Sequence, residues 1–339
     1  MKKLSAFLFS LFFYFVSQAQ NTRIEQLSSG TKTSIRGLSV VTNNVIWASG
    51  SNGMVGLSVN GGKDWKWIQV KGFEKTDFRD IEAFDGATAI IMAVDTPAYI
   101  LRTTDGGDTW KIVYENKKPG MFLDAMEFWN TEAGIVIGDP TDGKIFIART
   151  FDGGQTWREI PEQFKPRAEK GEACFAASGT NIRALDRNEA VFITGGLSSN
   201  VFIRDQKIKL PIVQGKETTG ANSIAVWDNK KLNGGNRMIV VGGDFSADTS
   251  AINNCFYSIN RGKSWNAPKV PPHGYRSCVE YITERKLIAC GTSGVDYSTD
   301  GGDTWSLITR EGYHVARKAK DGNTVYLAGG SGRIAKLVE

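Results

Sequence analysis

Residues Thr103-Thr104-Asp105-Gly106-Gly107-Asp108-Thr109-Trp110 form a turn motif whose close copies recur along the chain. The shared pattern is Ser/Thr-x-Asp/Asn-x-Gly-x-x-Trp. In a tight turn, Asp or Asn accepts hydrogen bonds from backbone amides, Gly adopts positive φ without steric penalty, and Trp anchors the returning strand in apolar surroundings. The motif therefore predicts a hairpin and contains no catalytic group. Its five copies pair Asn60 with Trp65, Asp105 with Trp110, Asp152 with Trp157, Asn260 with Trp265, and Asp300 with Trp305.

The spacing of the copies predicts the architecture. Successive tryptophans are separated by 45 residues (65 to 110), 47 (110 to 157), 108 (157 to 265) and 40 (265 to 305). The interval of 108 is about two repeats with the middle motif missing. A period of roughly 40 to 50 residues, filled with short strands, is typical of one four-stranded propeller blade. The sequence thus predicts an all-β fold, a seven-bladed β-propeller of four-stranded antiparallel blades.

The last repeat is one strand short. After Tyr313 it offers strands only near 315–319, 324–328 and 333–338, whereas the strand-like segment 22–27 precedes the first repeat and has no partner. We expect this N-terminal strand to complete the seventh blade, because closure removes the unpaired edges of a linear array. The ring is then expected to leave its centre free for a ligand.

The N-terminus has the pattern of a secretory signal peptide. Met1-Lys2-Lys3 precedes an apolar run from about Leu4 to Val16, and Ser17-Gln18-Ala19 forms a small-residue cleavage site. We expect export to the periplasm or the medium, with 1–19 removed and 20–339 forming a single propeller domain. A retained membrane anchor is the alternative, but the run is short for a span and no later stretch is apolar for long enough.

Charge and cysteine content exclude several classes of function. Loss of Lys2 and Lys3 lowers the net charge from +5 to +3, and without a basic run no nucleic-acid partner is expected. The four cysteines (174, 255, 278 and 290) contain no CxxC, and with only two histidines we expect no metal and no cofactor. Cys278 and Cys290 should lie on neighbouring strands; buried free thiols are favoured over a disulfide.

Together, the five motifs and their spacing resemble the Asp-box, or bacterial neuraminidase repeat. The chain after the cleavage site is similar to single-propeller Asp-box proteins related to the photosystem II stability and assembly factor, and more distantly to sialidases and xyloglucan hydrolases. In these families the box lies on the hairpin between the two outer strands, away from the channel. The resemblance implies a fold, and it assigns no active site to the box.

Function should reside where the inner strands begin, at the mouth of the channel. Aligned repeats place Arg36, Arg79, Asp124 and Arg276 at corresponding positions, and the loops after second strands place Asp95, Asp139 and Asp244 likewise. Asp80 follows Arg79, and the seventh repeat adds His314 and Arg317. Arginine presents a planar fork that suits carboxylates, so these side chains either bind an anionic group or pair with the nearby aspartates to join blades.

Two functions from different classes follow. The first is a non-enzymatic binding or assembly module that holds an envelope protein, or an anionic or carbohydrate ligand, at the mouth. The alternative is a glycoside hydrolase in which two of Asp80, Asp124, Asp139 and Asp244 supply the carboxylates. Arg36 occupies the position of the first sialidase arginine, but Gly37-Leu38 follows it in place of Ile-Pro. Dinucleotide chemistry is disfavoured, since Gly330-Ser331-Gly332 lacks a βαβ context.

Overall fold

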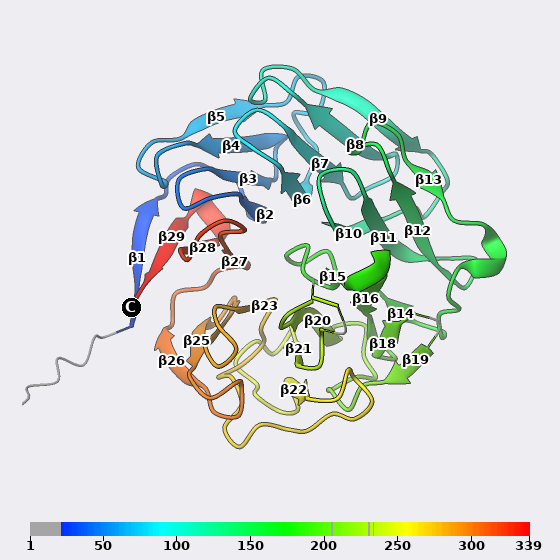
Figure 1. The fold of residues 1–339 in the computed structure, drawn as a ribbon, viewed down its shortest axis with the longest axis vertical. Helices are drawn as coiled ribbons and strands as arrows, with labels where there is room; N and C mark the ends of the chain where they lie inside the picture. Colours follow the sequence, from blue (N-terminus) through cyan, green and yellow to red (C-terminus); the bar gives the residue numbers. More distant parts are fainter. Residues whose placement is uncertain (1–21, 205, 230, 233) are drawn as a thin grey trace, which may run out of the picture.

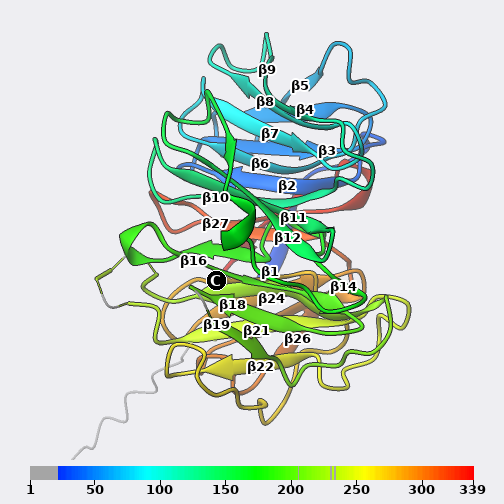
Figure 2. The same cartoon turned by 90° about the vertical axis from the view of Figure 1, so that its right-hand side faces the viewer.

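Seven β-sheets lie around a central axis in the computed structural model, which describes residues 22–204, 206–229, 231, 232 and 234–339. Figure 1 shows the sheets following one another around the ring in chain order. Seen from the side, the ring is shallower than it is wide (Figure 2). The predicted all-β, seven-bladed propeller is confirmed.

The blades are antiparallel sheets in which successive strands lie progressively farther from the axis. The first three blades contain β2 (Ile35–Val40), β3 (Ile46–Gly50), β4 (Met54–Ser58) and β5 (Lys66–Gln69); β6 (Phe78–Ala83), β7 (Ala89–Ala93), β8 (Ala98–Thr103) and β9 (Lys111–Asn116); and β10 (Leu123–Phe128), β11 (Gly134–Thr141), β12 (Lys144–Thr150) and β13 (Arg158–Glu159). The fourth and sixth contain β15 (Ile182–Ala184), β16 (Ala190–Ile193), β18 (Asn200–Ile203) and β19 (Gln206–Lys209); and β23 (Cys278–Tyr281), β24 (Leu287–Gly291), β25 (Gly294–Ser298) and β26 (Ser306–Thr309).

The fifth blade departs from the expected four strands. Its main strands are β20 (Thr219–Val226), β21 (Met238–Asp244) and β22 (Cys255–Ser258). The outer strand is reduced to one bridge between Tyr257 and Asn266. At the other edge of β20, the short strands β17 (Gly195–Gly196) and β14 (Glu172–Ala173) extend the sheet toward the fourth blade (Figure 1).

The N-terminal strand closes the ring. The seventh blade contains β27 (Val315–Lys318), β28 (Val325–Ala328) and β29 (Ile334–Val338), and β1 (Arg23–Ser28) completes it. The pairing is antiparallel, with Arg23 opposite Val338 and Glu25 opposite Lys336. The predicted closing strand is therefore confirmed, and it covers the edge of β29 that an open ring would expose.

The turn motifs lie between the third and fourth strands of their blades, as the resemblance implied. In the copy at 103–110, the Asp105 carboxylate accepts the Thr109 amide at 3.0 Å, and the Thr103 hydroxyl accepts the Gly107 amide at 3.1 Å. A Cβ on Gly107 would lie 2.8 Å from Ile68 of the preceding blade. The other four copies make the same two bonds and the same approach, so each motif also docks its blade on the one before.

The core is distributed around the ring. Buried apolar residues from adjacent blades form shared clusters, one of which joins Trp47 of the first blade to Phe78 of the second. All four cysteines are buried and free, although Cys278 and Cys290 lie opposite each other on β23 and β24. The helices among the described residues are η1 (Glu162–Phe164), η2 (Asp186–Asn188) and η3 (Gly330–Gly332), none of which is long enough to cross a membrane. The segment 1–19, expected to be a signal peptide, lies outside the described residues.

Candidate functional site

β-Bulges place polar side chains at one mouth of the channel. In four blades the pairing of the innermost main strand with the next strand shifts by one residue near the strand's start. The unpaired residues are Arg36, Arg79, Asp124 and Asn222. A bulge re-aims the side chain of its extra residue, which explains why polar groups occupy otherwise apolar inner strands. Repeat alignment identified the first three; Asn222 was missed, although its polarity within Ala221–Val226 was a usable signal.

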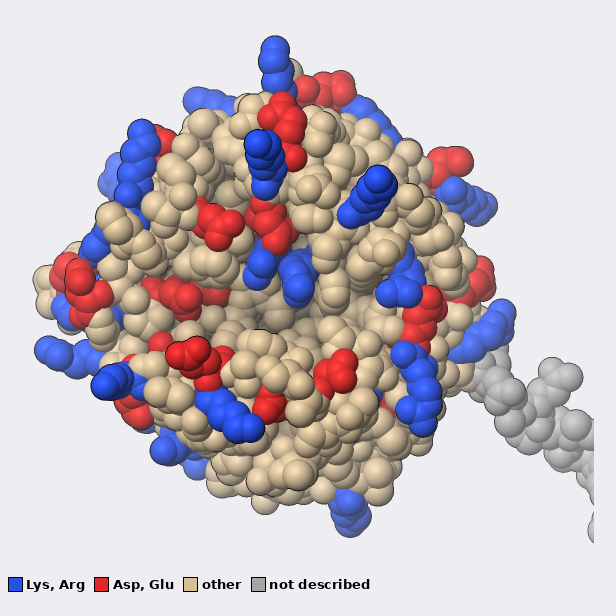
Figure 3. All heavy atoms as spheres, turned by 180° about the vertical axis from the view of Figure 1, so that it is seen from behind, with Lys and Arg blue, Asp and Glu red and all other residues tan. Residues whose placement is uncertain are grey.

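A cavity of about 500 Å³ opens at this first mouth. Figure 3 shows the face of the ring opposite to that in Figure 1, with a hollow at its centre and both basic and acidic side chains beside it. The lining of the first mouth combines residues expected there, Arg36, Arg79, Asp139 and His314, with an aromatic wall that the sequence did not reveal. The aromatic side chains are Phe122, Phe175, Phe245 and Tyr275.

The two arginines differ in their partners. The Arg79 Nε lies 2.8 Å from Asp77 Oδ2, and its guanidinium stands 5.9 Å from the centre of the Phe122 ring. Arg36 makes no ion pair within 4.0 Å with any residue that the structure describes, and it donates to the Ala177 carbonyl at 3.2 Å. Burial, and then the positive charge of Arg79, lower the pKa of Arg36. An anion bound in this mouth would offset both effects, because a nearby negative charge favours the charged form of arginine.

Ring contacts and a hydrogen bond hold the aromatic side chains of this wall in place. Phe245 contacts Phe175 edge-on, with 6.0 Å between ring centres, and approaches Tyr275 at 6.3 Å. The Tyr275 hydroxyl donates to Asn222 Oδ1 at 2.9 Å. Burial and the charge of Arg36 lower the pKa of His314 to about 4, so this histidine is neutral at pH 7. Phe245 is 46% exposed, so an apolar surface is available next to the cationic groups.

Arg276 lies behind the mouth and does not line it. Its side chain is fully buried, pairs with Asp296, and donates to the Ser293 hydroxyl at 2.9 Å. His273 also contacts Asp296, with 2.6 Å between Nδ1 and Oδ1. In the sixth blade β23 begins at Cys278, and Arg276 is not a bulge residue of the inner strand. Arg276 therefore pairs with an aspartate inside the fold, which is the alternative to ligand binding expected for these arginines.

The centre of the ring is occupied by the chain itself, contrary to the expected open channel. The segment 174–181, between β14 and β15, reaches into the middle of the ring (Figure 1). The Ser178 hydroxyl donates to the Ser277 carbonyl at 2.7 Å, and Thr180 donates to Ser223 at 2.6 Å. Segment 174–181 therefore separates the first mouth from a second mouth at the opposite end of the channel. It closes the inner end of both, so a ligand cannot pass through the ring.

Asp80 and Arg317 both lie against segment 174–181 and do not line the first mouth. Asp80 is buried, accepts the amides of Ile81 and Met126, and has its pKa raised to about 8 by burial. Arg317 donates to the Gly179 carbonyl at 3.0 Å and lines the cavity of the opposite mouth. Asp95 and Asp244 are not in the lining of the first mouth; Asp244 accepts the Ser246 amide and lies 3.5 Å from Lys216.

The second mouth, at the other end of the inner strands, has a cavity of about 610 Å³. Here two of the basic side chains pair with acidic ones. Arg183 is buried and lies 3.0 Å from Glu280 and 4.0 Å from Glu127, while Lys320 pairs with Glu82. Arg317 also lines this mouth and makes no ion pair within 4.0 Å among the described residues, but the charges of Glu280 and Glu127 outweigh its burial and raise its pKa.

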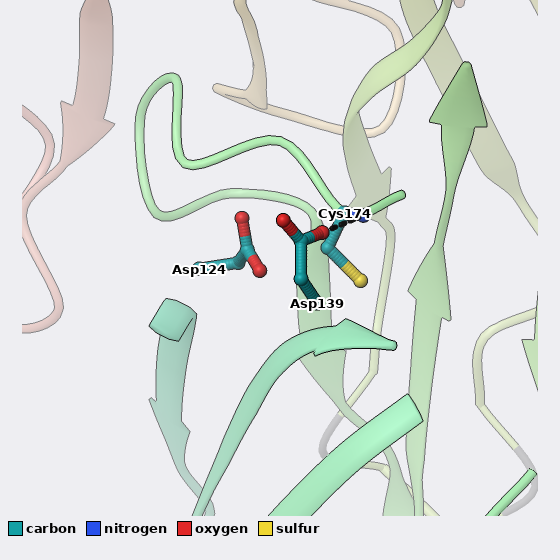
Figure 4. A group of neighbouring side chains, drawn as sticks. All are labelled: Asp124, Asp139 and Cys174. Carbon is teal, nitrogen blue, oxygen red and sulfur yellow. Dashed lines mark hydrogen bonds between the residues drawn. The ribbon is translucent and has the colours of Figure 1, made fainter. Parts of the chain in front are cut away.

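Asp124 and Asp139 converge with Cys174 at the edge of the first mouth (Figure 4). Burial, and then the charge of Asp139, raise the pKa of Asp124 well above its ordinary value; burial raises that of Asp139 to about 6. The Cys174 amide donates to Asp139 Oδ1 at 2.8 Å. Sequence spacing did not reveal this group, because 35 residues separate Asp139 from Cys174 and the segment 174–181 brings them together.

Comparisons with known proteins agree with the geometry. The BNR/Asp-box repeat family matches residues 296–307, which contain the last of the five motifs. No curated protein sequence matches the chain. The fold is similar to "YCF48 bound to D1 peptide", with a TM-score of 0.62 and 18% identity, covering 95% of this chain and 98% of that one.

Two further solved structures share the fold. YCF48 from Cyanidioschyzon merolae gives a TM-score of 0.61 and 17% identity, covering 93% of this chain and 98% of that one. The Pan2 WD40 domain of Neurospora crassa gives 0.62 and 11%, covering 94% and 96%. The chain therefore has a complete propeller of this architecture and carries the Asp-box repeat.

Proposed function

We propose that the protein is an exported binding module whose first mouth holds an acidic peptide segment, or a chain-terminal carboxylate, of a partner protein. One observation carries the proposal. Arg36 is a half-buried guanidinium that faces a cavity beside Arg79 and forms no ion pair with any described residue. A carboxylate accepts two parallel hydrogen bonds from such a fork, and desolvation strengthens the contact.

The walls of the mouth favour a peptide over a small inorganic anion. Phe122, Phe175 and Phe245 surround the cationic groups, so apolar side chains next to the carboxylate have a surface to cover. Aromatic side chains, tyrosine and phenylalanine among them, are enriched at the cores of protein interfaces. That a propeller of this architecture accommodates a peptide is supported by the solved structure titled as YCF48 bound to a D1 peptide.

Export is part of the proposal and rests on the sequence. Lys2 and Lys3, the apolar run that follows and the Ser17-Gln18-Ala19 site have the composition of a signal peptide. The partner is then a protein of the cell envelope or the medium. Amino-terminal sequencing of the mature protein tests cleavage after Ala19.

Binding is tested with labelled acidic peptides, each prepared with a free and with an amidated C-terminus, by fluorescence anisotropy. We expect Arg36→Gln and Arg79→Gln each to weaken binding by about tenfold to a hundredfold, because a lost charge-assisted contact costs roughly 1.5 to 3 kcal/mol. Arg158→Gln, on the exposed outer strand β13, is the matched control and should bind normally. Equal loss in all three variants, or no binding by the wild type, contradicts the proposal.

The hydrolase alternative gains no support from the carboxylates. Asp80 and Asp124 are buried, with 1% and 0% of their surface exposed, and Asp244 does not line the first mouth. A glycosidase needs two carboxylates flanking an accessible bond, about 5 Å or more apart. Among the described residues Asp139 is the sole carboxylate in the first-mouth lining.

A further inference from the structure

The side chains of Asp124, Asp139 and Cys174 meet although they come from three different elements. Asp124 is the bulge residue of β10, Asp139 lies in β11, and Cys174 follows β14. One oxygen of each carboxyl and the Cys174 sulfur all lie within 4.8 Å of one another. Figure 4 shows the two carboxyl groups facing each other, with Cys174 beside Asp139.

Asp124 is the unusual member of the group. Its side chain is 0% exposed, and neither carboxylate oxygen has a donor in hydrogen-bonding geometry among the described residues. Its carboxyl points at Asp139 (Figure 4). A buried carboxylate without a partner costs several kcal/mol, so such a group requires a proton or a cation at its oxygens.

The nearest protein cation does not fill this role. Arg79 lowers the pKa of Asp124, but its guanidinium is already engaged by Asp77 at 2.8 Å. The amides of Ala176 and Asp139 act in the same direction and are outweighed by burial. The space between the three side chains therefore remains the place where a positive charge is most favourable.

We propose that Asp124, Asp139 and Cys174 bind a divalent transition-metal ion, Zn²⁺ foremost. Two carboxylate oxygens and a thiolate suit the borderline-soft Zn²⁺, whereas Mg²⁺ and Ca²⁺ take six or more oxygen ligands. Three protein ligands leave one tetrahedral position for water or another donor. Asp139 and Cys174 line the first-mouth cavity, which supplies the route by which the ion enters.

The test uses Zn²⁺ and Co²⁺ alone, added to reduced, chelator-treated wild-type protein without any peptide. Calorimetry should show one Zn²⁺ per chain, with affinity increasing with pH because the ion displaces protons from the thiol and the carboxyls. Co²⁺ should give the near-ultraviolet charge-transfer band of a cobalt–thiolate bond. Asp124→Asn, Asp139→Asn and Cys174→Ser should each weaken Zn²⁺ binding at least about tenfold, and Cys174→Ser should abolish the band.

Matched variants separate this site from adventitious binding. Cys255→Ser removes another buried thiol, and Asp244→Asn another carboxylate outside the cluster; both should bind Zn²⁺ as the wild type does. The proposal is overturned by wild-type protein that binds no stoichiometric Zn²⁺, or by Co²⁺ spectra without the thiolate band. Neither measurement depends on the folding of a variant, and neither depends on peptide binding.

Discussion

The two mouths of the propeller are built by the same inner strands and differ in how their charges are compensated. At the second mouth, Arg183 lies between Glu280 and Glu127, and Lys320 pairs with Glu82. At the first mouth, Arg36 forms no ion pair with any residue described, while Asp124 and Asp139 face each other. Two basic side chains at the second mouth are paired within the chain, and we propose that Arg36 and the two aspartates at the first mouth serve bound ligands.

The difference has a structural origin. Bulges near the starts of β2, β6, β10 and β20 re-aim single side chains at the first mouth. At the other end of these strands the ladders continue without a shift, from Leu38 to Val40 and from Ile81 to Ala83. A regular strand alternates its side chains between the two faces of the sheet, and the extra residue of a bulge interrupts this alternation and re-aims one side chain.

The largest change in stability is expected from breaking the Arg183–Glu280 ion pair of the second mouth. Arg183→Met should lower the free energy of unfolding by about 3 kcal/mol, because a buried pair that loses one partner leaves an uncompensated charge. Denaturant titration at neutral pH measures the change. The double variant Arg183→Met/Glu280→Gln should recover part of the loss, since a neutral amide then replaces the partly buried carboxylate of Glu280.

The same substitution at the first mouth provides the comparison. Arg36→Met should change the free energy of unfolding by less than about 1 kcal/mol, since one hydrogen bond to Ala177 is exchanged for relief of desolvation. If Arg36→Met proves as destabilising as Arg183→Met, the distinction between the two mouths fails.

The next effect concerns the pH dependence of stability at the first mouth. Burial raises the pKa of Asp139 to about 6, against about 3.9 in an unfolded chain. The folded state therefore holds the proton more tightly, and the stability from this group is full below pH 4 and is lost as pH rises through 6. Relative to wild type, Asp139→Asn should gain stability over this interval, by at most about 1.4 kcal/mol per pH unit.

Denaturant titrations of both proteins at pH 4.5 and 7.5, with chelator present, measure this gain. Asp244→Asn is a control of opposite sign. Hydrogen bonding from Thr218 and the Ser246 amide lowers the pKa of Asp244, so the stability this carboxylate contributes is lost as pH falls. If the free energies of unfolding of wild type and Asp139→Asn change with pH in the same way, the pKa of Asp139 is not raised in the folded state.

The fold was predictable because its signal is local and repeated. Each Asp-box motif specifies its own hairpin through hydrogen bonds between residues at most four apart, such as Thr109 to Asp105. The spacing of the motif tryptophans predicts the number of blades. The unpaired segment at 22–27 likewise predicted the closing strand. The fifth blade was less predictable, because β14 and β17 pair over only two residues each and carry no periodic pattern.

The site was predictable only in part. Repeat alignment found Arg36, Arg79 and Asp124, since the bulge recurs at the same strand position. It also selected Arg276, whose blade has no such bulge and whose side chain turns to Asp296. The aromatic wall and the position of Cys174 depend on the non-repeated segment 174–181, whose path through the ring is set by tertiary contacts and by nothing periodic in the sequence.

The smallest effect sharpens the comparison by removing one of the few compensating charges at the first mouth. Asp77 holds Arg79 at 2.8 Å, and both side chains are partly exposed, so Asp77→Asn should cost less than about 1 kcal/mol of stability. It should free the Arg79 guanidinium and tighten the binding of an acidic peptide by about threefold to tenfold, with a steeper salt dependence. Asp142→Asn, which releases Lys118 outside the first-mouth lining, should leave the affinity unchanged. Fluorescence anisotropy at two salt concentrations measures both, and weaker binding by Asp77→Asn would mean that the carboxylate positions Arg79 for the ligand and does not compete with it.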